Sequence, residues 1–565
     1  MQLTKMEESD ESANPPATDL PPFASGNARD LGDLCYDALS RYGFLSLLLL
    51  LLALVFIRSV SESHLKVIWY DEVFSVIVAT QPTWHRFALA MPADGNPPLY
   101  PLLTRLSIHL FGLSDVAIRL PAMLSFLAAL FGIYVFVRKE CGVVFGLLAV
   151  VLTFSESGWT YSYEARPYAL LLAFMMLALV SWQSAANAAE ATPPRPRRLA
   201  LAGLAVGIAG SILSHGIGLI EVGFPLLLGE AVRLYRTRRI DWPVLATALS
   251  IIPALAIVLP MMRRTSALLL IYTHAGMHPL TLSKVYAFCT SNIRMTMPLL
   301  LNSNLVEIVV IAILLTWVPP WLVHSRAEGL SASDRGTPAH PSAESIAAAF
   351  GASLLIPATM LFMMFTTGYY NCRYGIGSIA GVALLGALMI GRQGRRQTTI
   401  CLGLMALLVL LFVHGTLTAI RQPSRQPAGF AAIFSAPHGG LPIVISDPFN
   451  YALTWWYAPP SMKNQIVYLT DKPTAIERGY VVTEVALVEE KPLISARMDD
   501  YYGFIAAQDH FLLDTDGDIR FLFLKDRLES AGYRSTLLAD DGFNHLYDMQ
   551  RSASPGTINS IMNTR

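Results

Sequence analysis

The sequence is poor in charged residues. Only 15% of its 565 residues are charged and 53% are hydrophobic, whereas soluble domains carry about 25% charged residues. The 41 Lys and Arg residues balance the 41 Asp and Glu residues, so we expect no overall attraction to nucleic acid. The shortage of charge indicates a chain that lies largely in a membrane.

Cysteine is also scarce, and no CxxC pair is present. This excludes a disulfide framework and the usual zinc-binding spacings. A glycine-rich phosphate-binding loop is missing too, which disfavours a nucleotide donor. The stretch DTDGD, residues 514–518, lacks the spacing and the distal glutamate of an EF-hand. We therefore interpret it as a solvated turn.

Long hydrophobic runs, by contrast, are abundant. A helix that spans a bilayer needs about 20 apolar residues. On this criterion we predict an α-helical polytopic membrane protein with about eleven transmembrane helices, near residues 43–59, 119–137, 142–156, 167–183, 199–214, 216–232, 242–261, 304–323, 345–366, 374–390 and 398–419.

Basic clusters predict the orientation of these spans. They stand at Arg138, just before Leu199, at 233–239 and at 392–396, in alternate and mostly short loops. By the positive-inside rule these loops are cytoplasmic. The polar, proline-rich residues 1–42 are then a disordered cytoplasmic tail, and an odd number of spans places the carboxyl terminus outside. We expect an integral protein of the bacterial inner membrane.

The predicted outward segments are longer than simple turns. The transmembrane domain, 43–420, has outward loops at 58–118 and 262–303. Residues 421–565 mix short apolar strands, in LPIVISD, QIVYLT and HFLLDTDGD, with the amphipathic stretch IRFLFLKDRLESAGY. This alternation predicts a soluble extracytoplasmic α/β domain.

The first outward loop holds two adjacent acids, Asp71 and Glu72, in the stretch VIWYDEVFSVIVAT. This stretch, TWHRFALAM and PPLYPLLTRLSIHLFG are apolar but too short to span, so they predict helices that lie along the interface. Neighbouring helix positions differ by about 100° in direction. Hence one acid can face a cavity while the other anchors the loop. The alternative is that both acids simply face water.

Further polar candidates stand at predicted outer ends of spans. Glu164 and Arg166 lie in YSYEARPYALL beside Tyr163, where they can also form a local ion pair that caps a helix. Arg373 and Tyr374 lie in the aromatic stretch TTGYYNCRYGIGS, which suits a lipid phosphate group. The alternative for Arg373 is a side chain that extends from the membrane to water. His215, between two spans, is a candidate at a cavity wall or a structural histidine.

Four stretches, taken in order, resemble a known family. WYDEVFS, NPPLYPLL, RLPAMLSFL and YSYEARPYALLL are similar to motifs of polyprenyl-phosphate-dependent glycosyltransferases with the GT-C fold. The likeness is greatest to the superfamily of protein O-mannosyltransferases, aminoarabinose transferases and lipopolysaccharide-core transferases, over roughly residues 44–420. The resemblance implies a membrane enzyme that transfers a hexosyl or pentosyl group.

The resemblance also implies roles for single residues. Asp71 matches the acid that serves as catalytic base, and Glu72 completes that motif in a supporting role. Glu164 and Arg166 match the acidic motif thought to bind the acceptor or donor. Asn96 departs from the pattern, because many relatives carry histidine at this position. A histidine-dependent role there, including metal binding, is therefore in doubt.

The function that follows is transfer of a sugar from a polyprenyl-phosphate donor to an acceptor hydroxyl on the outer face, with inversion. We expect the acceptor to be an envelope glycan, a lipid or a protein. Arg373 is our preferred phosphate clamp; the other candidates are Arg263, Arg264, Lys284 and Arg294, with weaker substrate candidates in Tyr272 and His274. We expect no cofactor, although some GT-C enzymes use a divalent cation at the first acid.

A different class of function is a polytopic transporter, or a flippase for lipid-linked envelope glycan precursors. Transporters place charged residues near the middle of the membrane and show internal repeats. In this sequence the charges gather at the predicted outer ends of the spans, and no repeat is visible. This pattern favours the enzyme over the transporter.

The predicted orientation of Asp71 is testable by labelling. In a variant without native cysteines, Asp71→Cys should react with a membrane-impermeant maleimide added to intact spheroplasts. Reaction only after the membrane is opened would contradict the predicted outer location.

Overall fold

In the computed structural model of this chain, the described residues are 44–91, 95–154, 159–187, 195–273, 283, 341–366, 370–392, 398–422, 428–435, 439–494, 496–516, 519–540 and 544–552. The tail predicted at 1–42, the span predicted at 304–323 and most of the loop predicted at 262–303 lie outside them.

The first part of the chain is helical. We call residues 44–421 the helical domain. Its elements are α2 (Phe44–Leu65), α3 (Tyr70–Ala79), α4 (Trp84–Ala90), α5 (Leu99–Phe111), α6 (Asp115–Cys141), α7 (Val143–Leu152), η3 (Thr160–Tyr163), α9 (Tyr168–Asn187), α10 (Arg195–Ser214), α11 (Gly218–Thr237), α12 (Trp242–Ala246), η5 (Thr247–Ser250), α13 (Ile251–Thr273), α17 (Ala343–Ser353), α18 (Leu355–Thr366), η6 (Cys372–Gly375), α19 (Gly377–Gly391) and α20 (Thr398–Arg421).

Helix α6 shows how the sequence sets these boundaries. Ser114 accepts a hydrogen bond from the amide of Ala117, and Asp115 follows in the first turn. Both favour a helix start. Ser114 satisfies a free N–H group, and the negative charge of Asp115 interacts favourably with the positive end of the helix dipole. Arg138 and Lys139 occupy the last turn, and Gly142 ends the helix with a φ of 92°. The 27 residues between are long enough to cross a bilayer.

The predicted fold class, a helical membrane protein with a C-terminal α/β domain, is confirmed. Among the described residues, six helices are long and apolar enough to span, or seven if the bent pair α17–α18 is one span. Helices α7 and α19 coincide with two further predicted spans but are shorter, at 10 and 15 residues. The count of eleven stays a prediction.

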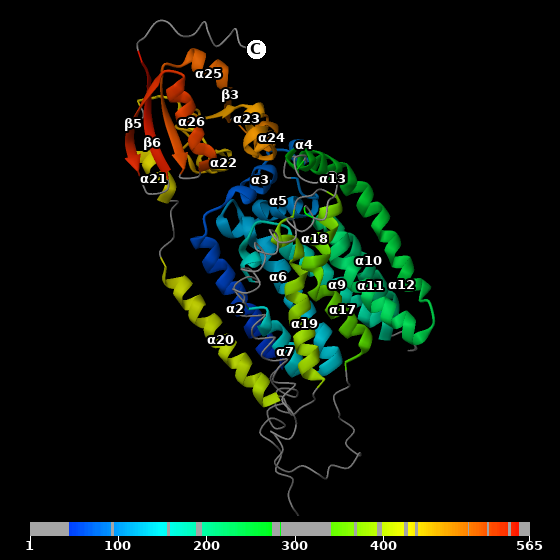
Figure 1. The fold of residues 1–565 in the computed structure, drawn as a ribbon. Helices are drawn as coiled ribbons and strands as arrows, with labels where there is room; N and C mark the ends of the chain where they lie inside the picture. Colours follow the sequence, from blue (N-terminus) through cyan, green and yellow to red (C-terminus); the bar gives the residue numbers. More distant parts are fainter. Residues whose placement is uncertain are drawn as a thin grey trace, which may run out of the picture.

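The three short helices predicted for the first outward loop are also present. Helices α3, α4 and α5 follow α2 and lie at the end of the bundle next to the sheet domain (Figure 1). We call this end the domain end. Each of the three is too short to cross a bilayer of about 30 Å, so they form a layer between the bundle and the sheet.

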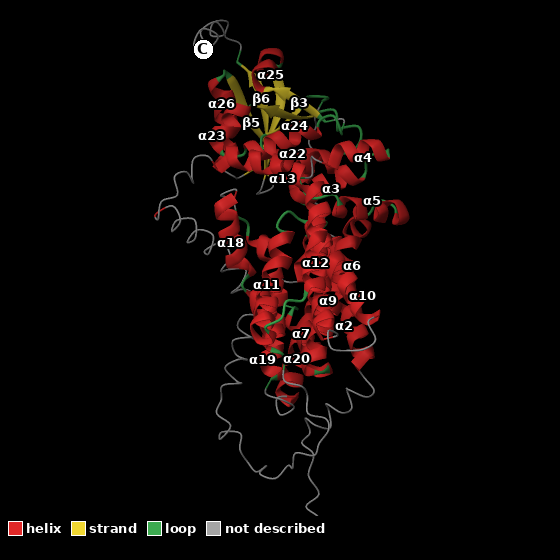
Figure 2. Cartoon of the chain, turned by 90° about the vertical axis from the view of Figure 1, so that its right-hand side faces the viewer, coloured by secondary structure: helices red, strands yellow, loops and turns green. Residues whose placement is uncertain are grey.

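The C-terminal part, residues 428–552, is the sheet domain, which stands above the domain end (Figures 1 and 2). Its strands are β1 (Ile443–Ile445), β2 (Ile466–Thr470), β3 (Arg497–Asp500), β4 (His510–Asp516), β5 (Tyr533–Asp540) and β6 (Asn544–Arg551). Its helices are α21 (Ala428–Ser435), α22 (Pro448–Tyr457), α23 (Lys472–Arg478), α24 (Val481–Glu490), α25 (Tyr501–Ala507) and α26 (Ile519–Ser530).

The strands form one sheet in the order β3-β2-β1-β4-β6-β5. The first four are parallel, and β6 pairs antiparallel with both β4 and β5. The predicted strands and the predicted helix at IRFLFLKDRLES are confirmed. The turn predicted at 514–518 is partly wrong, because β4 continues to Asp516 and Asp514 is buried.

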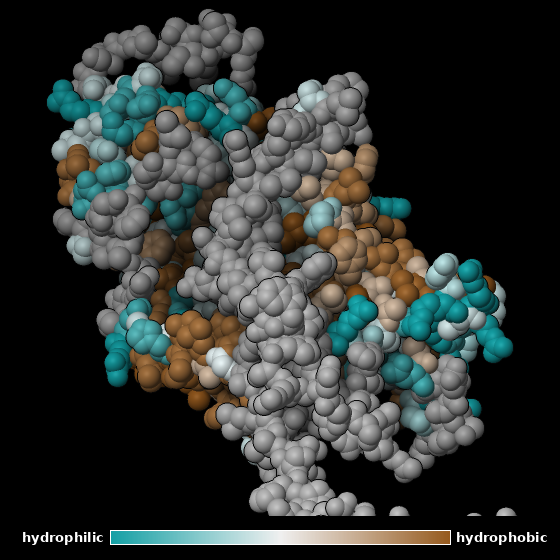
Figure 3. Space-filling view, turned by 60° about the horizontal axis from the view of Figure 1, so that its bottom comes forward, coloured by the Kyte–Doolittle hydropathy of each residue, from teal (hydrophilic) through white to brown (hydrophobic). Residues whose placement is uncertain are grey.

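Alternating side chains give the sheet two apolar faces. Val444, with its neighbours on that face, packs under α25 and α26. Ile443 and Ile445 point the other way, toward α22 and the helical domain. Figure 3 shows hydrophobic side chains over much of the visible helical bundle, while hydrophilic ones gather on the sheet domain and at a second place on the right of the bundle.

Close helix packing in the bundle is testable at Gly381 of α19. A Cβ atom there would overlap the backbone of Ala352 and Ser353 on α17. Gly381→Ala should therefore lower the free energy of unfolding by about 1–3 kcal/mol, measured as a lower midpoint of thermal unfolding in detergent.

The matched control is Gly403→Ala on α20, where nothing lies within 4 Å of the new Cβ. This variant should be neutral or slightly more stable, since alanine is the better helix former. Equal midpoints for the two variants would contradict the packing described.

Candidate active site

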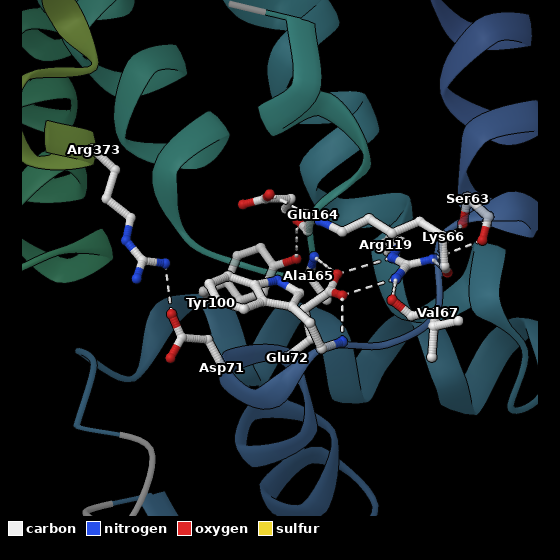
Figure 4. A network of polar contacts seen from close by, with 11 residues as sticks. Ser63, Lys66, Val67, Asp71, Glu72, Tyr100, Arg119, Glu164, Ala165 and Arg373 are labelled. Carbon is white, nitrogen blue, oxygen red and sulfur yellow. Dashed lines mark hydrogen bonds and ion pairs between the residues drawn. The ribbon is translucent and has the colours of Figure 1, made fainter. Parts of the chain in front are cut away.

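Helix α3 carries the two adjacent acids in its first turn, a position that the helix dipole favours. Their side chains point in different directions, Asp71 toward Arg373 and Glu72 toward Arg119 (Figure 4). Glu72 is fully buried, whereas the side chain of Asp71 keeps 21% of its surface exposed. The two acids therefore occupy different environments.

Glu72 forms an ion pair with Arg119 of α6, and neither side chain is exposed. The guanidinium donates from Nε to Oε1 at 2.9 Å and from Nη2 to Oε2 at 2.8 Å. The amide of Ala165 donates to Oε1 at 2.6 Å, and the amide of Trp69 donates to Oε2 at 3.3 Å. Both carboxylate oxygens of Glu72 thus accept two hydrogen bonds each.

Arg119 is satisfied as completely as Glu72. Besides its two bonds to the carboxylate, it donates to the carbonyl oxygens of Ser63, Lys66 and Val67 at the end of α2, at 2.7, 3.0 and 3.3 Å. A guanidinium has five N–H groups, and here each finds an acceptor. A buried ion pair is tolerated only when its remaining polar groups are satisfied in this way.

These contacts determine the charge of Glu72. Burial alone would raise the pKa of its carboxyl group, but the charge and hydrogen bonds of Arg119, followed by Lys66 and the Ala165 amide, hold the pKa below its ordinary value. Glu72 is therefore a charged structural anchor, and its oxygens have no capacity left to accept a proton from a substrate.

Asp71 meets a different arginine. Arg373, from η6, donates from Nη1 to Oδ2 of Asp71 at 2.5 Å. Arg166 donates from Nη1 to the backbone oxygen of Asp71 at 2.8 Å. Both predicted cations, from segments 95 and 302 positions away along the chain, thus converge on the predicted base.

The guanidinium of Arg373 lies over two aromatic rings. Its Cζ is 5.0 Å from the ring centre of Trp69 and 5.7 Å from that of Tyr168. Burial disfavours the charged form, but Tyr168 and Asp71 outweigh it, so the pKa of Arg373 is raised. Arg373 stays cationic, as binding of a phosphate requires.

Lys66, at the end of α2, is a site residue that sequence reasoning missed. Its Nζ donates to Oε1 of Glu164 at 2.8 Å and lies 5.6 Å from the ring centres of both Trp69 and Tyr163. The ring of Trp69 therefore has two cations near it, Lys66 and Arg373. The only signal in the sequence was a lone lysine just before the WYDE motif.

Two more predicted residues line the same region through aromatic contacts. The ring of His215 lies 5.3 Å from Tyr168 and 5.6 Å from Tyr374. Its Nδ1 accepts a hydrogen bond from the amide of Ile217 at 3.2 Å. Burial, aided by Arg166 and Arg373, lowers the pKa of His215 to about 3. It is therefore neutral and supports the ring cluster on which Arg373 rests.

Asn96 is buried just ahead of α5. From α5, Tyr100 points its hydroxyl to the backbone oxygen of Glu164, at 3.5 Å. This contact links α5 to the segment between η3 and α9. The carboxylate of Glu164 pairs with Lys66. The alternative from the sequence, a local ion pair between Glu164 and Arg166, is therefore not the pairing seen.

The alternative phosphate clamps lie elsewhere. Arg264 forms an ion pair with Glu489 of the sheet domain. Lys284, Arg294 and His274 are outside the described residues, and so is the side chain of Tyr272. Within the described residues, no group of three or more His, Cys, Asp or Glu side chains could hold a metal ion.

Known proteins resemble this chain in part. Residues 95–262 match the model of the family described as dolichyl-phosphate-mannose-protein mannosyltransferase. The resemblance to glycosyltransferases that the motifs predicted is thus confirmed over this segment, which includes Asn96, Glu164, Arg166 and His215 but not Asp71 or Glu72. No curated protein matches the chain.

Several solved structures are similar to the chain. ArnT from Cupriavidus metallidurans in the apo state has 13% identity and a TM-score of 0.44, and covers 90% of this chain and 98% of its own. ArnT bound to undecaprenyl phosphate has 15% identity, a TM-score of 0.42 and the same coverages. The archaeal oligosaccharyltransferase AglB from Archaeoglobus fulgidus, in complex with an inhibitory peptide and a dolichol-phosphate, has 12% identity, a TM-score of 0.40 and coverages of 92% and 75%. The similarity thus extends over most of the chain, but the sequence identities and TM-scores are low.

The structural role of Glu72 is testable by stability. Glu72→Gln removes the charge opposite the buried Arg119 and should lower the free energy of unfolding by about 3–5 kcal/mol. The control, Glu164→Gln, breaks a pair with Lys66 in which the lysine and glutamate side chains keep 26% and 17% of their surface exposed, and should cost about 0–1 kcal/mol. Thermal unfolding in detergent compares the two, and similar losses would contradict the anchor role.

The stability difference between wild type and Glu72→Gln should also depend on pH in a defined direction. Because the pKa of Glu72 is lower in the folded protein than its ordinary 4.5, its contribution to stability is complete above about pH 4.5 and is lost at lower pH. The stability gap between wild type and Glu72→Gln should therefore narrow below that pH. A gap that widens in acid would contradict the lowered pKa.

Proposed function

We propose that this chain is a membrane glycosyltransferase that moves a sugar from a polyprenyl-phosphate donor to an acceptor hydroxyl at the extracytoplasmic face, with inversion. The observation that carries the proposal is the convergence of Asp71 and Arg373, a partly exposed carboxylate and a cation, at the domain end of the bundle. The matched family supports it, since its description names a dolichyl-phosphate-linked mannose donor.

Asp71 is the general base of the proposed reaction. The acceptor oxygen attacks the anomeric carbon of the donor while its proton passes to a carboxylate oxygen of Asp71. A positioned base contributes about 10²–10⁴-fold to such a step. Glu72 does not compete for this role, because both of its oxygens are occupied by Arg119 and backbone amides.

Arg373 receives the leaving group. The bond between the anomeric carbon and the phosphate oxygen breaks, and the electron pair stays on the lipid phosphate. A fixed cation stabilises the charge that develops there. The neighbouring rings of Trp69 and Tyr168 suit a phosphate that stands at the boundary of a bilayer, since tryptophan and tyrosine favour that depth.

The ion pair between Asp71 and Arg373 also implies an order of events. While the two side chains are paired, the carboxylate is engaged and is a poor proton acceptor. A phosphate oxyanion competes with Asp71 for the guanidinium, because charge-assisted bonds to phosphate are strong. Donor binding would therefore free Asp71 just when a base is required.

The proposal is tested in a deletion strain that is complemented with variants. Wild type should restore one sugar to an envelope glycan or glycoprotein, seen as a mass difference by mass spectrometry. Asp71→Asn should insert normally and retain binding of undecaprenyl phosphate, measured by native mass spectrometry, yet lower the rate of sugar transfer by at least 100-fold. Arg373→Ala should weaken that binding by tenfold or more.

A normal glycan mass in the Asp71→Asn strain would contradict the assigned base. Uptake of a lipid-linked precursor by proteoliposomes, without any glycosylated product, would instead favour the transporter or flippase. The first result would mean that the base is assigned to the wrong residue, and the second that the class of function is wrong.

A further inference from the structure

The sheet domain packs directly against the helix that carries Asp71. Helix α22 lies beside α3 (Figure 1), and the two contribute to one continuous hydrophobic core. From α3 this core takes Val73, Phe74 and Ile77, and from the sheet domain it takes Tyr451 and Trp455 among others. The domain boundary therefore passes through a packed core and not through a flexible contact.

One hydrogen bond crosses this boundary close to the proposed base. The hydroxyl of Tyr457, at the end of α22, accepts from the backbone amide of Ile68 at 2.8 Å, across 389 positions of the chain. Ile68 directly precedes Trp69, which is the N-cap of α3. The ring of Tyr457 is itself held by stacking on Phe430, at 5.7 Å. Tyr457 thus fixes the backbone just before Asp71.

Two other contacts hold α3 from the same side. The ring of Tyr70, the residue next to Asp71, lies 4.5 Å from that of Phe449 at the start of α22. Beyond the far end of α3, Gln81 donates from Nε2 to the carbonyl oxygen of Leu493 at 3.2 Å. The sheet domain therefore contacts α3 at both ends, and the N-terminal end carries Asp71.

The helical domain holds the opposite side of the same turn through Glu72 and Arg119. The helical domain also binds the backbone on both sides of Ile68, through Arg119 to the carbonyl oxygen of Val67 and through Arg166 to that of Asp71. A base must stay within hydrogen-bond reach of its proton, about 2.6–3.2 Å, and a displacement of 1 Å can cost about 100-fold in rate. The bond from Tyr457 adds a restraint from the sheet domain at the amide of Ile68, between these attachments.

We propose that the sheet domain is a positioning element for catalysis, with Tyr457 as a positioning residue that sets the place of Asp71 through the backbone of Ile68. This inference rests on the proposed function, because it takes Asp71 as the base. It assigns the sheet domain a task within the transfer step, which neither its fold nor the matched family segment indicates.

The test compares two tyrosines on the same helix. Tyr457→Phe removes the bond across the boundary and keeps the ring. Tyr451→Phe removes a buried hydroxyl that donates to the carbonyl oxygen of Arg497 at 3.1 Å, within the sheet domain. Each variant loses one hydrogen bond, so both should lower stability by a similar small amount. Only Tyr457→Phe should disturb the base.

Three quantities are measured for each variant in the complemented deletion strain or on purified protein. They are the rate at which the glycan mass shift appears after induction, the affinity for undecaprenyl phosphate, and the midpoint of thermal unfolding. We expect Tyr457→Phe to lower the rate three- to tenfold with unchanged affinity for undecaprenyl phosphate. Tyr451→Phe should leave both the rate and the affinity at the wild-type level.

Equal rates for the two variants would overturn the positioning role, whatever their stabilities. So would a fall in rate that is matched by weaker binding of undecaprenyl phosphate, since that would place the effect on the donor site. Asp71→Asn is measured in parallel. If Asp71→Asn is inactive and the two tyrosine variants are alike, the positioning inference fails and the proposed function stands; if Asp71→Asn is active, the proposed function itself fails.

Discussion

The arrangement of the site depends on one buried ion pair. Glu72 and Arg119 are completely enclosed. Between them they hold the end of α2, the first turn of α3, the start of α6 and the backbone at Ala165, just before α9. Breaking such a pair on one side leaves an uncompensated buried charge. The pair therefore ties these four segments to one another around the turn that carries Asp71.

The pair also explains why two neighbouring acids serve different purposes. Because Glu72 faces inward, the preceding side chain on the helix, Asp71, faces another direction. In that direction Asp71 contacts Arg373. The anchor is charged and saturated with hydrogen bonds, whereas the carboxylate of the candidate base is paired, among the described residues, with Arg373. From the other side, the sheet domain reaches the same turn through Tyr457. The turn that carries the candidate base is thus held between two domains.

Local features of this architecture could be predicted from the sequence, and long-range pairings could not. Hydrophobic length located long apolar helices among the described residues, short apolar runs located β1, β2 and β4, and the WYDE motif located the acids. The partner of Glu72 was not found, although Arg119 begins the quoted motif RLPAMLSFL, because a buried pair 47 positions apart leaves no periodic signal. The same holds for Lys66 with Glu164 and for Tyr457 with Ile68, where tertiary packing alone brings the residues together.

The most direct measurement is an experimental structure of the protein with undecaprenyl phosphate bound. The account predicts that the phosphate lies within hydrogen-bond distance of Arg373, that the bond from Arg373 to Asp71 is broken, and that the bonds between Glu72 and Arg119 are unchanged. A phosphate bound away from Arg373, with Asp71 and Arg373 still paired, would contradict it.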